Sequence, residues 1–236
     1  MKNVLFDLDG TLLAMDQDEF VKMYFKALTE KMSKFGYEPE KLMKTLWNGV
    51  YAMVKNPGEK TNEEVFWDTF ESVYGKQTVE DKSKFEDFYR NEFQSVGNAV
   101  KEKKDVDKLF YILKKRGVQP ILATAPLFPS IATRSRVKWA GMNPDDFSYI
   151  STYENSHSSK PMPAYYEELI HKLSLDPKEC IMIGNDTEED MIAEKLGINV
   201  YLVTDYIVNK HDYDVNTWPH GSFDEMLEYL DNWLGC

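Results

Sequence analysis

The sequence predicts an α/β protein, a doubly wound parallel sheet of the Rossmann-like kind with an all-helical domain inserted after its first strand. Three observations support this prediction. From about residue 105 onward, short apolar runs alternate with amphipathic stretches of helical period. Between about residues 15 and 100, aromatic and Met residues recur at helical spacing instead. The chain also opens with Val4-Leu5-Phe6, an apolar run ending in Asp-Leu-Asp-Gly, which is typical of a buried strand entering a turn.

Outside the insertion, each apolar run of four or five residues predicts a buried strand, and each amphipathic run predicts a helix. Strands that alternate with helices favour a parallel sheet covered on both faces. Gly117 and Gly197 follow two of the expected helices, where glycine commonly ends a helix. We expect strands at 4–6, 120–124, 149–152, 181–184 and 200–203, and helices at 106–113, 130–140, 163–173, 191–196 and 223–233.

The insertion is predicted to contain four helices. The first includes Phe20 to Phe35 and stops at Gly36, and Pro39 opens the second. Thr61 to Glu64 forms a capping-box pattern ahead of the third helix, and the fourth includes Phe85 to Phe93. We interpret the aromatic residues mainly as the core of this bundle rather than as substrate contacts. The expected domains are a catalytic core of residues 1–14 and 100–236 and a helical cap of residues 15–99.

Composition limits the classes of function. A chain of 236 residues with 42% hydrophobic residues suits one core plus an insertion. The net charge of −12 disfavours nucleic-acid binding but allows a small anionic substrate. Apolar runs are too short for a signal segment or a membrane span, and the two cysteines, Cys180 and Cys236, form no disulfide framework or metal spacing. We therefore expect a cytoplasmic protein without a membrane partner, either a monomer or a homodimer.

Polar residues cluster where the expected strands end. In a doubly wound sheet, ligands bind beyond the carboxyl ends of the strands. Lys160 adds a positive charge just before an expected helix. The strand-end residues are Asp7, Asp9, Thr124 and the segment Gly184-Asn185-Asp186, with Asp190 at the start of the next helix.

These clusters resemble the four motifs of the haloacid dehalogenase superfamily. Asp7-Leu-Asp-Gly-Thr-Leu12 resembles the first motif, Thr124 the second, Lys160-Pro161 the third and Gly184-Asn-Asp-Thr-Glu-Glu-Asp190 the fourth. An Asp-x-Asp pair alone is weak support, but four motifs in order along the whole core are specific. The helical insertion resembles the cap that many members carry between the first and second motifs.

The resemblance implies a reaction. Asp7 would be the nucleophile that attacks phosphorus. Asp9, two residues on and on the same side of the strand, would protonate the leaving oxygen and later activate water. The family's dehalogenases lack an Asp at this second position, so Asp9 favours phosphate chemistry.

The resemblance also implies Mg²⁺, which would reduce the repulsion between a carboxylate and a phosphate dianion. Its expected ligands are the Asp7 carboxylate, the Asp9 backbone carbonyl and Asp186, with Asp190 acting directly or through water. Family members often have Gly-Asp where this chain has Gly184-Asn185-Asp186. Either Asn185 or Asp186 therefore fills the metal position, and the interval to Asp190 favours Asp186.

Further residues are expected around the substrate. Lys160 would add positive charge beside the nucleophile and the phosphate, and Thr124 would donate a hydrogen bond to a phosphoryl oxygen. The remaining expected substrate-binding residues are Gly10, Thr11, Ala125 and Asn185.

Four other side chains have an ordinary structural interpretation. We expect Arg134 and Arg136 on a solvated helix face, with substrate contact by one of them as the alternative. His157 is expected in a loop near the site without a catalytic role, and Cys180 in the core.

The favoured function is a magnesium-dependent phosphomonoesterase that acts on a small phosphorylated metabolite through an aspartyl-phosphate. One alternative is a phosphomutase, which would use the same nucleophile and acid. Another is a non-catalytic binding or regulatory protein on the same fold. The sequence does not name the substrate.

Overall fold

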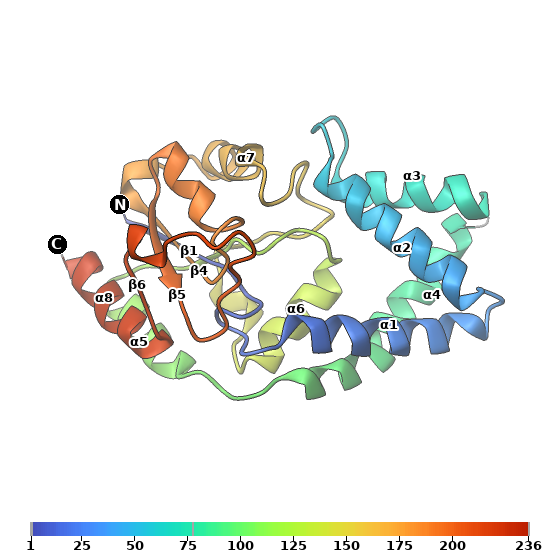
Figure 1. The fold of residues 1–236 in the computed structure, drawn as a ribbon, viewed down its shortest axis with the longest axis horizontal. Coiled ribbons are helices and arrows are strands. Elements are labelled where there is room, and N and C mark those ends of the chain that lie inside the picture. The colour runs from blue at the N-terminus through green and yellow to red at the C-terminus, as the bar shows by residue number, and fades with distance from the viewer. Residues whose placement is uncertain (1, 77, 236) are drawn as a thin grey trace.

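The computed structural model describes residues 2–76 and 78–235; Met1, Gln77 and Cys236 lie outside this part of the chain. Among the described residues, six strands form one parallel sheet in the order β3-β2-β1-β4-β5-β6 (Figure 1). This topology confirms the predicted doubly wound fold. The strands are β1 (Asn3–Phe6), β2 (Ile121–Leu122), β3 (Tyr149–Ile150), β4 (Cys180–Gly184), β5 (Asn199–Val203) and β6 (His220–Gly221).

Strand β1 lies in the middle of the sheet, between β2 and β4. Leu5 is level with Ile121 on one side and with Met182 on the other. Alternate residues of β1 point to opposite faces, as the period of a strand requires. Val4 and Phe6 join one buried cluster, whereas Leu5 joins the other, so both faces of the sheet are covered.

The core helices divide between these two faces. One cluster contains residues of α5 (Val106–Lys115), α6 (Ser130–Trp139) and α8 (Phe223–Gly235). The other contains residues of α7 (Pro163–Leu173) and of the 3₁₀ segment η4 (Met191–Leu196). Figure 1 shows α7 on the side of the sheet opposite to α5 and α8. Three further 3₁₀ turns are η2 (Pro144–Asp146), η3 (Pro177–Glu179) and η5 (Val215–Thr217).

The helical insertion lies between β1 and β2, as expected. At its third helix, the Thr61 hydroxyl accepts from Glu64 N while the Glu64 carboxylate accepts from Thr61 N, which confirms the capping box. The insertion consists of α1 (Gln17–Ser33), α2 (Pro39–Val54), α3 (Asn62–Tyr74), α4 (Thr78–Arg90) and the 3₁₀ segment η1 (Glu92–Ala99).

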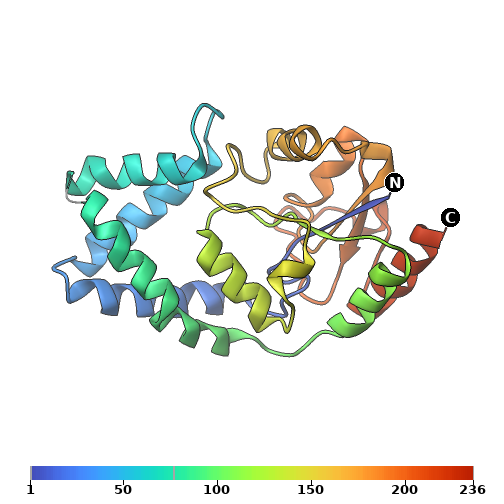
Figure 2. The same cartoon turned by 180° about the vertical axis from the view of Figure 1, so that it is seen from behind.

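The fourth helix of the insertion is shorter than predicted. It ends at Arg90, and Phe93 lies in η1 instead. Asn91 leaves the helical conformation at φ −115° and ψ −86°, and its side chain bonds back to the Asp87 carbonyl at 3.0 Å. Asn side chains commonly compete with a helix in this way. The change of direction brings Phe93 against Trp139 of α6, with ring centroids 4.9 Å apart. Figure 2 shows the end of the insertion, in green, beside α6, in yellow-green.

Four core elements also differ from the prediction. The segment 191–196 is a 3₁₀ helix rather than an α-helix, because it has only six residues before Gly197 turns the chain at φ +83°. Strands β2 and β3 have two residues each and are shorter than their apolar runs. Strand β6 was not predicted, since two residues leave no periodic pattern to detect.

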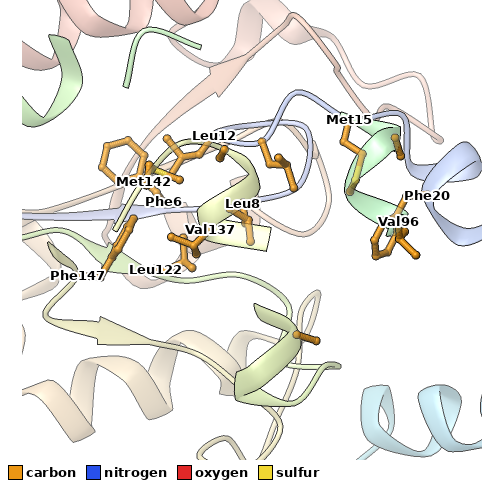
Figure 3. Packing of buried hydrophobic residues seen from close by; sticks show 14 of the residues in the cluster. Phe6, Leu8, Leu12, Met15, Phe20, Val96, Leu122, Val137, Met142 and Phe147 are labelled. Atoms are coloured by element: carbon orange, nitrogen blue, oxygen red, sulfur yellow. The ribbon is translucent and has the colours of Figure 1, made fainter. Parts of the chain in front are cut away.

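The two connections between the insertion and the core run side by side. Met15 forms an antiparallel bridge with Val100, and Lys101 N donates to Ala14 O at 2.9 Å. The crossing lies next to the expected boundary of the cap at residues 15 and 99; the exact division stays a prediction. One buried apolar cluster continues from Phe6 in the sheet to Phe20 at the base of α1 (Figure 3).

A second contact joins the start of α3 to a core loop. Asn62 N donates to Ser156 O and Glu63 N to Tyr153 O, both at 2.8 Å. The buried Asn62 side chain also donates to the carbonyls of Pro126 and Ser158 at 3.2 and 3.1 Å. First-turn N–H groups of a helix have no partner within the helix, so this loop supplies acceptors for them. The loop leads directly to Lys160. The cap is therefore hydrogen-bonded to the core next to the polar residues expected at the strand ends.

No helix in the described ranges is long and apolar enough to cross a membrane.

Replacing Asn62 tests this contact. Asn62→Ala should lower the free energy of unfolding by about 1–3 kcal/mol, because two buried carbonyl oxygens lose their donor. The matched control is Asn48→Ala, which alters an exposed position of α2 and should change stability by less than about 0.5 kcal/mol. Urea denaturation followed by circular dichroism measures both. Equal effects of the two substitutions would contradict the proposed contribution of this contact.

Candidate active site

The polar residues that follow β1, β2 and β4 meet at one edge of the sheet. Asp7 N donates to Ile183 O at 2.9 Å, and Ala123 N donates to Phe6 O at 2.7 Å, so the ladder continues just past the strands. This pairing brings Asp7 beside the end of β4. Thr124 follows Ala123 and is buried, with its carbonyl accepting from the Tyr165 hydroxyl at 3.1 Å.

Lys160 lies at the centre of this edge. Its side chain is fully buried, and Nζ lies 2.9 Å from Asp7 Oδ1 and 2.5 Å from Asp190 Oδ1. Burial alone would lower the pKa of Lys160, but the carboxylates of Asp190 and Asp7 outweigh it and hold the pKa well above its usual range. Lys160 is therefore a permanent positive charge against the residue expected to be the nucleophile.

Asp7 is a buried carboxylate with the carboxylates of Asp9 and Asp190 near it and Lys160 as its cation. Burial raises the pKa of Asp7 well above its ordinary value, and the nearby Asp190 and Asp9 carboxylates raise it further against the effect of Lys160. Burial and the Asp190 charge also raise the pKa of Asp186. The site therefore has excess negative charge, which a bound cation would stabilise.

Asp9 pairs with Arg136, and this corrects the expectation of a solvated arginine. Arg136 Nη1 donates to Asp9 Oδ2, and the Arg136 side chain is only 1% exposed. The guanidinium also lies 4.5 Å from the centre of the Phe128 ring, a cation–π distance. By contrast, Arg134 is half exposed and pairs with Asp145, as expected for a solvated face.

The burial of Arg136 has a simple cause. The buried residues of α6 are Ala132, Thr133, Arg136 and Val137, which share one face of a helix. Arg136 thus faces the sheet edge, where Asp9 is its charge partner. Burial raises the pKa of Asp9, while Arg136 and Lys160 lower it. The other oxygen, Asp9 Oδ1, is buried without a hydrogen-bond partner among the described residues, so it remains available to a substrate.

The turn after β4 is braced against the turn after β1. Asn185 Oδ1 accepts from the Thr11 hydroxyl at 3.0 Å, and Asn185 Nδ2 donates to Tyr206 O at 2.5 Å. Gly10 allows this approach, since a Cβ there would lie 2.3 Å from Asn185 Nδ2 and φ is +84°. The backbone N–H groups of Gly10 and Thr11 bond within their own turn, to Leu13 O and Leu8 O.

These contacts bear on the predicted substrate-binding set. The hydrogen bonds of Thr11 and Asn185 lie within the protein, and they support a bracing role rather than direct substrate contact. Ala125, in contrast, lines the cavity next to Asp9. Substrate binding by Gly10, Thr11, Ala125 and Asn185 therefore stays a prediction, with the geometry favouring Ala125.

The two acidic residues of the fourth motif make different contacts. Asp186 Oδ1 accepts from Glu188 N at 2.8 Å and Glu189 N at 2.9 Å. Both carboxylate oxygens of Asp190 accept hydrogen bonds from the protein. Oδ1 accepts from Lys160 Nζ, and Oδ2 accepts from Asp186 N at 3.0 Å. The contacts of Asp190 thus fit an indirect contribution to metal binding better than a direct one.

The oxygen donors of this edge fit Mg²⁺. In the part of the chain that the structure describes, no three His, Cys, Asp or Glu side chains are grouped to hold a metal ion. Magnesium needs fewer side chains, because it is usually bound by one or two carboxylates together with water and substrate oxygens. The expected ligands, Asp7, the Asp9 carbonyl and Asp186, would be such a donor set, and the excess negative charge is consistent with it.

Glu189 was missed by the sequence interpretation. It lines the same cavity as Asp9, and burial raises its pKa to about 7 against the opposing charge of Lys160. Its position inside the fourth motif, directly before Asp190, was the available signal. His157 lies in the loop before Lys160, as expected, and bonds to Glu168 at 3.0 Å; its lack of a catalytic role stays a prediction.

Comparison with known proteins identifies the family to which this chain belongs. The chain matches the family of haloacid dehalogenase-like hydrolases over residues 1–204. It therefore belongs to that family, and the expected superfamily and helical cap insertion are confirmed. No curated protein matches the chain.

Solved structures share the fold at low sequence identity. The 2-haloacid dehalogenase of Pseudomonas syringae pv. Tomato DC3000 has a TM-score of 0.64 and 20% identity over 99% of both chains. A predicted phosphoglycolate phosphatase of Haemophilus somnus 129PT has a TM-score of 0.58 and 18% identity over 98% of both chains. The putative HAD-hydrolase YfnB of Bacillus subtilis, bound to magnesium, has a TM-score of 0.53 and 16% identity, also over 98% of both. These likenesses establish the fold.

The two arginines of α6 offer a matched test of the buried pair. Arg136→Met should lower the free energy of unfolding by about 3–5 kcal/mol, because the Asp9 carboxylate loses its partner while still buried. Arg134→Met breaks an exposed pair on the same helix and should cost at most about 1 kcal/mol. Urea denaturation in metal-free buffer compares them. In the double variant Arg136→Met/Asp9→Asn, part of the loss should be recovered; no recovery would argue against the charge pair.

Proposed function

We propose that this chain is a magnesium-dependent phosphomonoesterase that acts on a small phosphorylated metabolite through an aspartyl-phosphate on Asp7. The observation that carries this proposal is the pair Asp7 and Asp9 at one sheet edge. Asp7 touches the buried Lys160, and Asp9 lines the cavity below the cap. A nucleophile and a proton donor on one strand end are what cleavage of a phosphate ester requires.

In the proposed reaction, an Asp7 carboxylate oxygen attacks phosphorus and the bond to the leaving oxygen breaks. Asp9 donates a proton to that oxygen, and the alcohol departs. Asp9 then removes a proton from water, which attacks the phosphorus of the aspartyl-phosphate and releases inorganic phosphate. Arg136 fixes Asp9 Oδ2, so the unpartnered Oδ1 is the atom that carries the proton.

Lys160 and the start of the loop after β2 support the phosphoryl group. The ammonium of Lys160 lies against Asp7 and offsets the charge of the incoming phosphate. Thr124 and nearby backbone N–H groups would donate hydrogen bonds to phosphoryl oxygens. When bound by Asp7, the Asp9 carbonyl and Asp186, Mg²⁺ would supply the remaining positive charge.

Asp9 also separates phosphate chemistry from dehalogenation, the reaction named for some of the structural neighbours. A halide ion leaves without a proton, so a dehalogenase gains nothing from an acid at this position. An alkoxide leaves far more easily when it is protonated. The buried and oriented Asp9 therefore supports phosphomonoester hydrolysis over dehalogenation.

The nucleophile is tested by Asp7→Asn. Release of phosphate from an aryl phosphate with Mg²⁺ should fall below detection, because an amide cannot form the aspartyl-phosphate. The fold should persist, since Lys160 keeps its contact with Asp190 and the crowding of carboxylates is reduced. Circular dichroism and thermal unfolding provide the control. Wild-type turnover by this variant would refute the mechanism, and chloride release from a 2-haloacid by the wild type would favour dehalogenation.

The metal donors are tested by Asp186→Asn. Mg²⁺ should raise the thermal midpoint of the wild type, because a ligand that binds only the native state stabilises it. This shift and the magnesium-dependent activity should both be strongly reduced in Asp186→Asn. Glu188→Gln, which alters a neighbouring acid, should retain them. If Asp186→Asn responds to Mg²⁺ like the wild type, Asp186 is not a ligand and Asn185 becomes the alternative.

A further inference from the structure

A cavity of about 260 Å³ lies between the cap and the core. We call it the cap cavity. On the core side it is lined by Asp9, Ala125, Arg136 and Glu189, so it begins at the candidate active site. On the other sides its walls are helices α1 to α4 and the loops around Phe128 and Tyr153. A leaving group attached to a phosphate at Asp7 would therefore lie in this cavity.

The walls of the cap cavity are mostly hydrophobic and rich in aromatic side chains. Aromatic side chains favour offset or edge-to-face contact with other flat rings. The rings pack on one another: Phe66 and Trp67 lie 5.3 Å apart at an interplanar angle of 89°, and Phe25 and Trp47 lie 5.2 Å apart. The aromatic residues that matter most here are Phe25, Trp47, Phe66, Trp67, Tyr89 and Tyr153.

Several polar groups on these walls already have partners within the protein. The hydroxyls of Tyr24 and Tyr89 bond to each other at 2.9 Å. Lys82 lies 3.5 Å from Glu63 and over the Trp67 ring. The buried N–H of Trp67 has no partner among the described residues and is an exception. A sugar with several hydroxyls would replace few of its bonds to water against the apolar parts of these walls, which is unfavourable.

The charge and the volume of the cap cavity further restrict the kind of group that can bind there. The acids of the wall outnumber its cations: the acids are Asp9, Glu63, Glu86 and Glu189, and the cations are Lys82 and Arg136. A leaving group with further phosphates would be repelled. The volume lies just below the range of about 300–1,000 Å³ typical of small-molecule sites, which suits one ring or a small fused ring system.

We propose that the cap cavity selects phosphomonoesters whose leaving group is a flat, apolar, aromatic alcohol, in preference to sugar phosphates and nucleotides. This inference rests on the proposed phosphomonoesterase function and names its substrate class.

Gly49 of α2 contributes to this selectivity from behind the wall. A Cβ at this position would lie 2.6 Å from Cδ2 of Phe66, so glycine is what allows the Phe66 ring to rest against α2. Any larger residue forces the ring toward the cavity or displaces the helix. Gly49 has no part in the proposed reaction of Asp7 and Asp9. Substituting it therefore alters the cavity without altering the chemistry.

The test compares three monoesters of primary alcohols, so that intrinsic leaving-group reactivity is similar. They are 2-phenylethyl phosphate, ethyl phosphate and glucose 6-phosphate, each assayed for phosphate release with Mg²⁺. We expect kcat/KM for 2-phenylethyl phosphate to exceed the other two by about 10- to 100-fold, from burial of the ring. Equal or faster hydrolysis of glucose 6-phosphate overturns the inference while the proposed function stands. Absence of turnover with all three refutes the proposed function itself.

Variants then locate the preference in the cavity. Gly49→Ala and Trp47→Ala should each lower the ratio of kcat/KM for 2-phenylethyl phosphate to that for ethyl phosphate by about 10-fold, mainly through KM. Because the ratio is taken within one variant, partial loss of folded protein cancels. Tyr51→Ala alters an exposed residue of the same helix outside the cavity and should leave the ratio unchanged. An unchanged ratio in both cavity variants overturns the inference.

Discussion

The buried ammonium group of Lys160, held between Asp7 and Asp190, is the interaction on which the active edge depends. A lysine without access to water must be paired, and removal of both partners would leave an uncompensated charge. The pairing therefore ties the loop before α7 to the ends of β1 and β4. Gly184 allows it, since a Cβ there would lie 2.1 Å from Asp190 Oδ2. Positions that look like independent motifs along the chain are thus one electrostatic unit.

A second buried pair, Asp9 with Arg136, connects this unit to the cap cavity. With the proposed Mg²⁺, the two cations would offset the carboxylates of this edge, so that a chain of net charge −12 could bind a small anion there. Their charges are concentrated where the carboxylates converge, while the cavity beyond is mainly hydrophobic. In the proposed reaction, chemistry and selectivity would be separated in space: the sheet edge would support attack on phosphorus, and the cap would surround the departing group. Hydrogen bonds from Asn62 to a core loop hold the two parts together.

Much of this arrangement could be predicted from local sequence. Strand-end positions of Asp7, Thr124 and Asp186 follow from parallel connectivity, which brings the carboxyl ends of strands to one edge. Arg136 was misjudged because it was considered as part of a basic segment. Its spacing from Ala132 and Val137 would have indicated the buried face of α6. The aromatic residues of the insertion were expected mainly as bundle core, and many of them, such as Phe85, are buried there while also lining the cavity.

The sequence by itself determined the fold class, the helical insertion and the order of the acidic, hydroxyl and lysine residues along one edge. These properties depend on periodicity and chain connectivity, which are local. Only the tertiary structure decided that Arg136 pairs with Asp9, that Asn185 braces Thr11 and that the aromatic residues enclose a cavity. The first two depend on packing between distant segments of the core, and the third depends on how the cap packs against the core. Asp7 is thus recognisable from its motif, whereas the group that it would release is selected by packing.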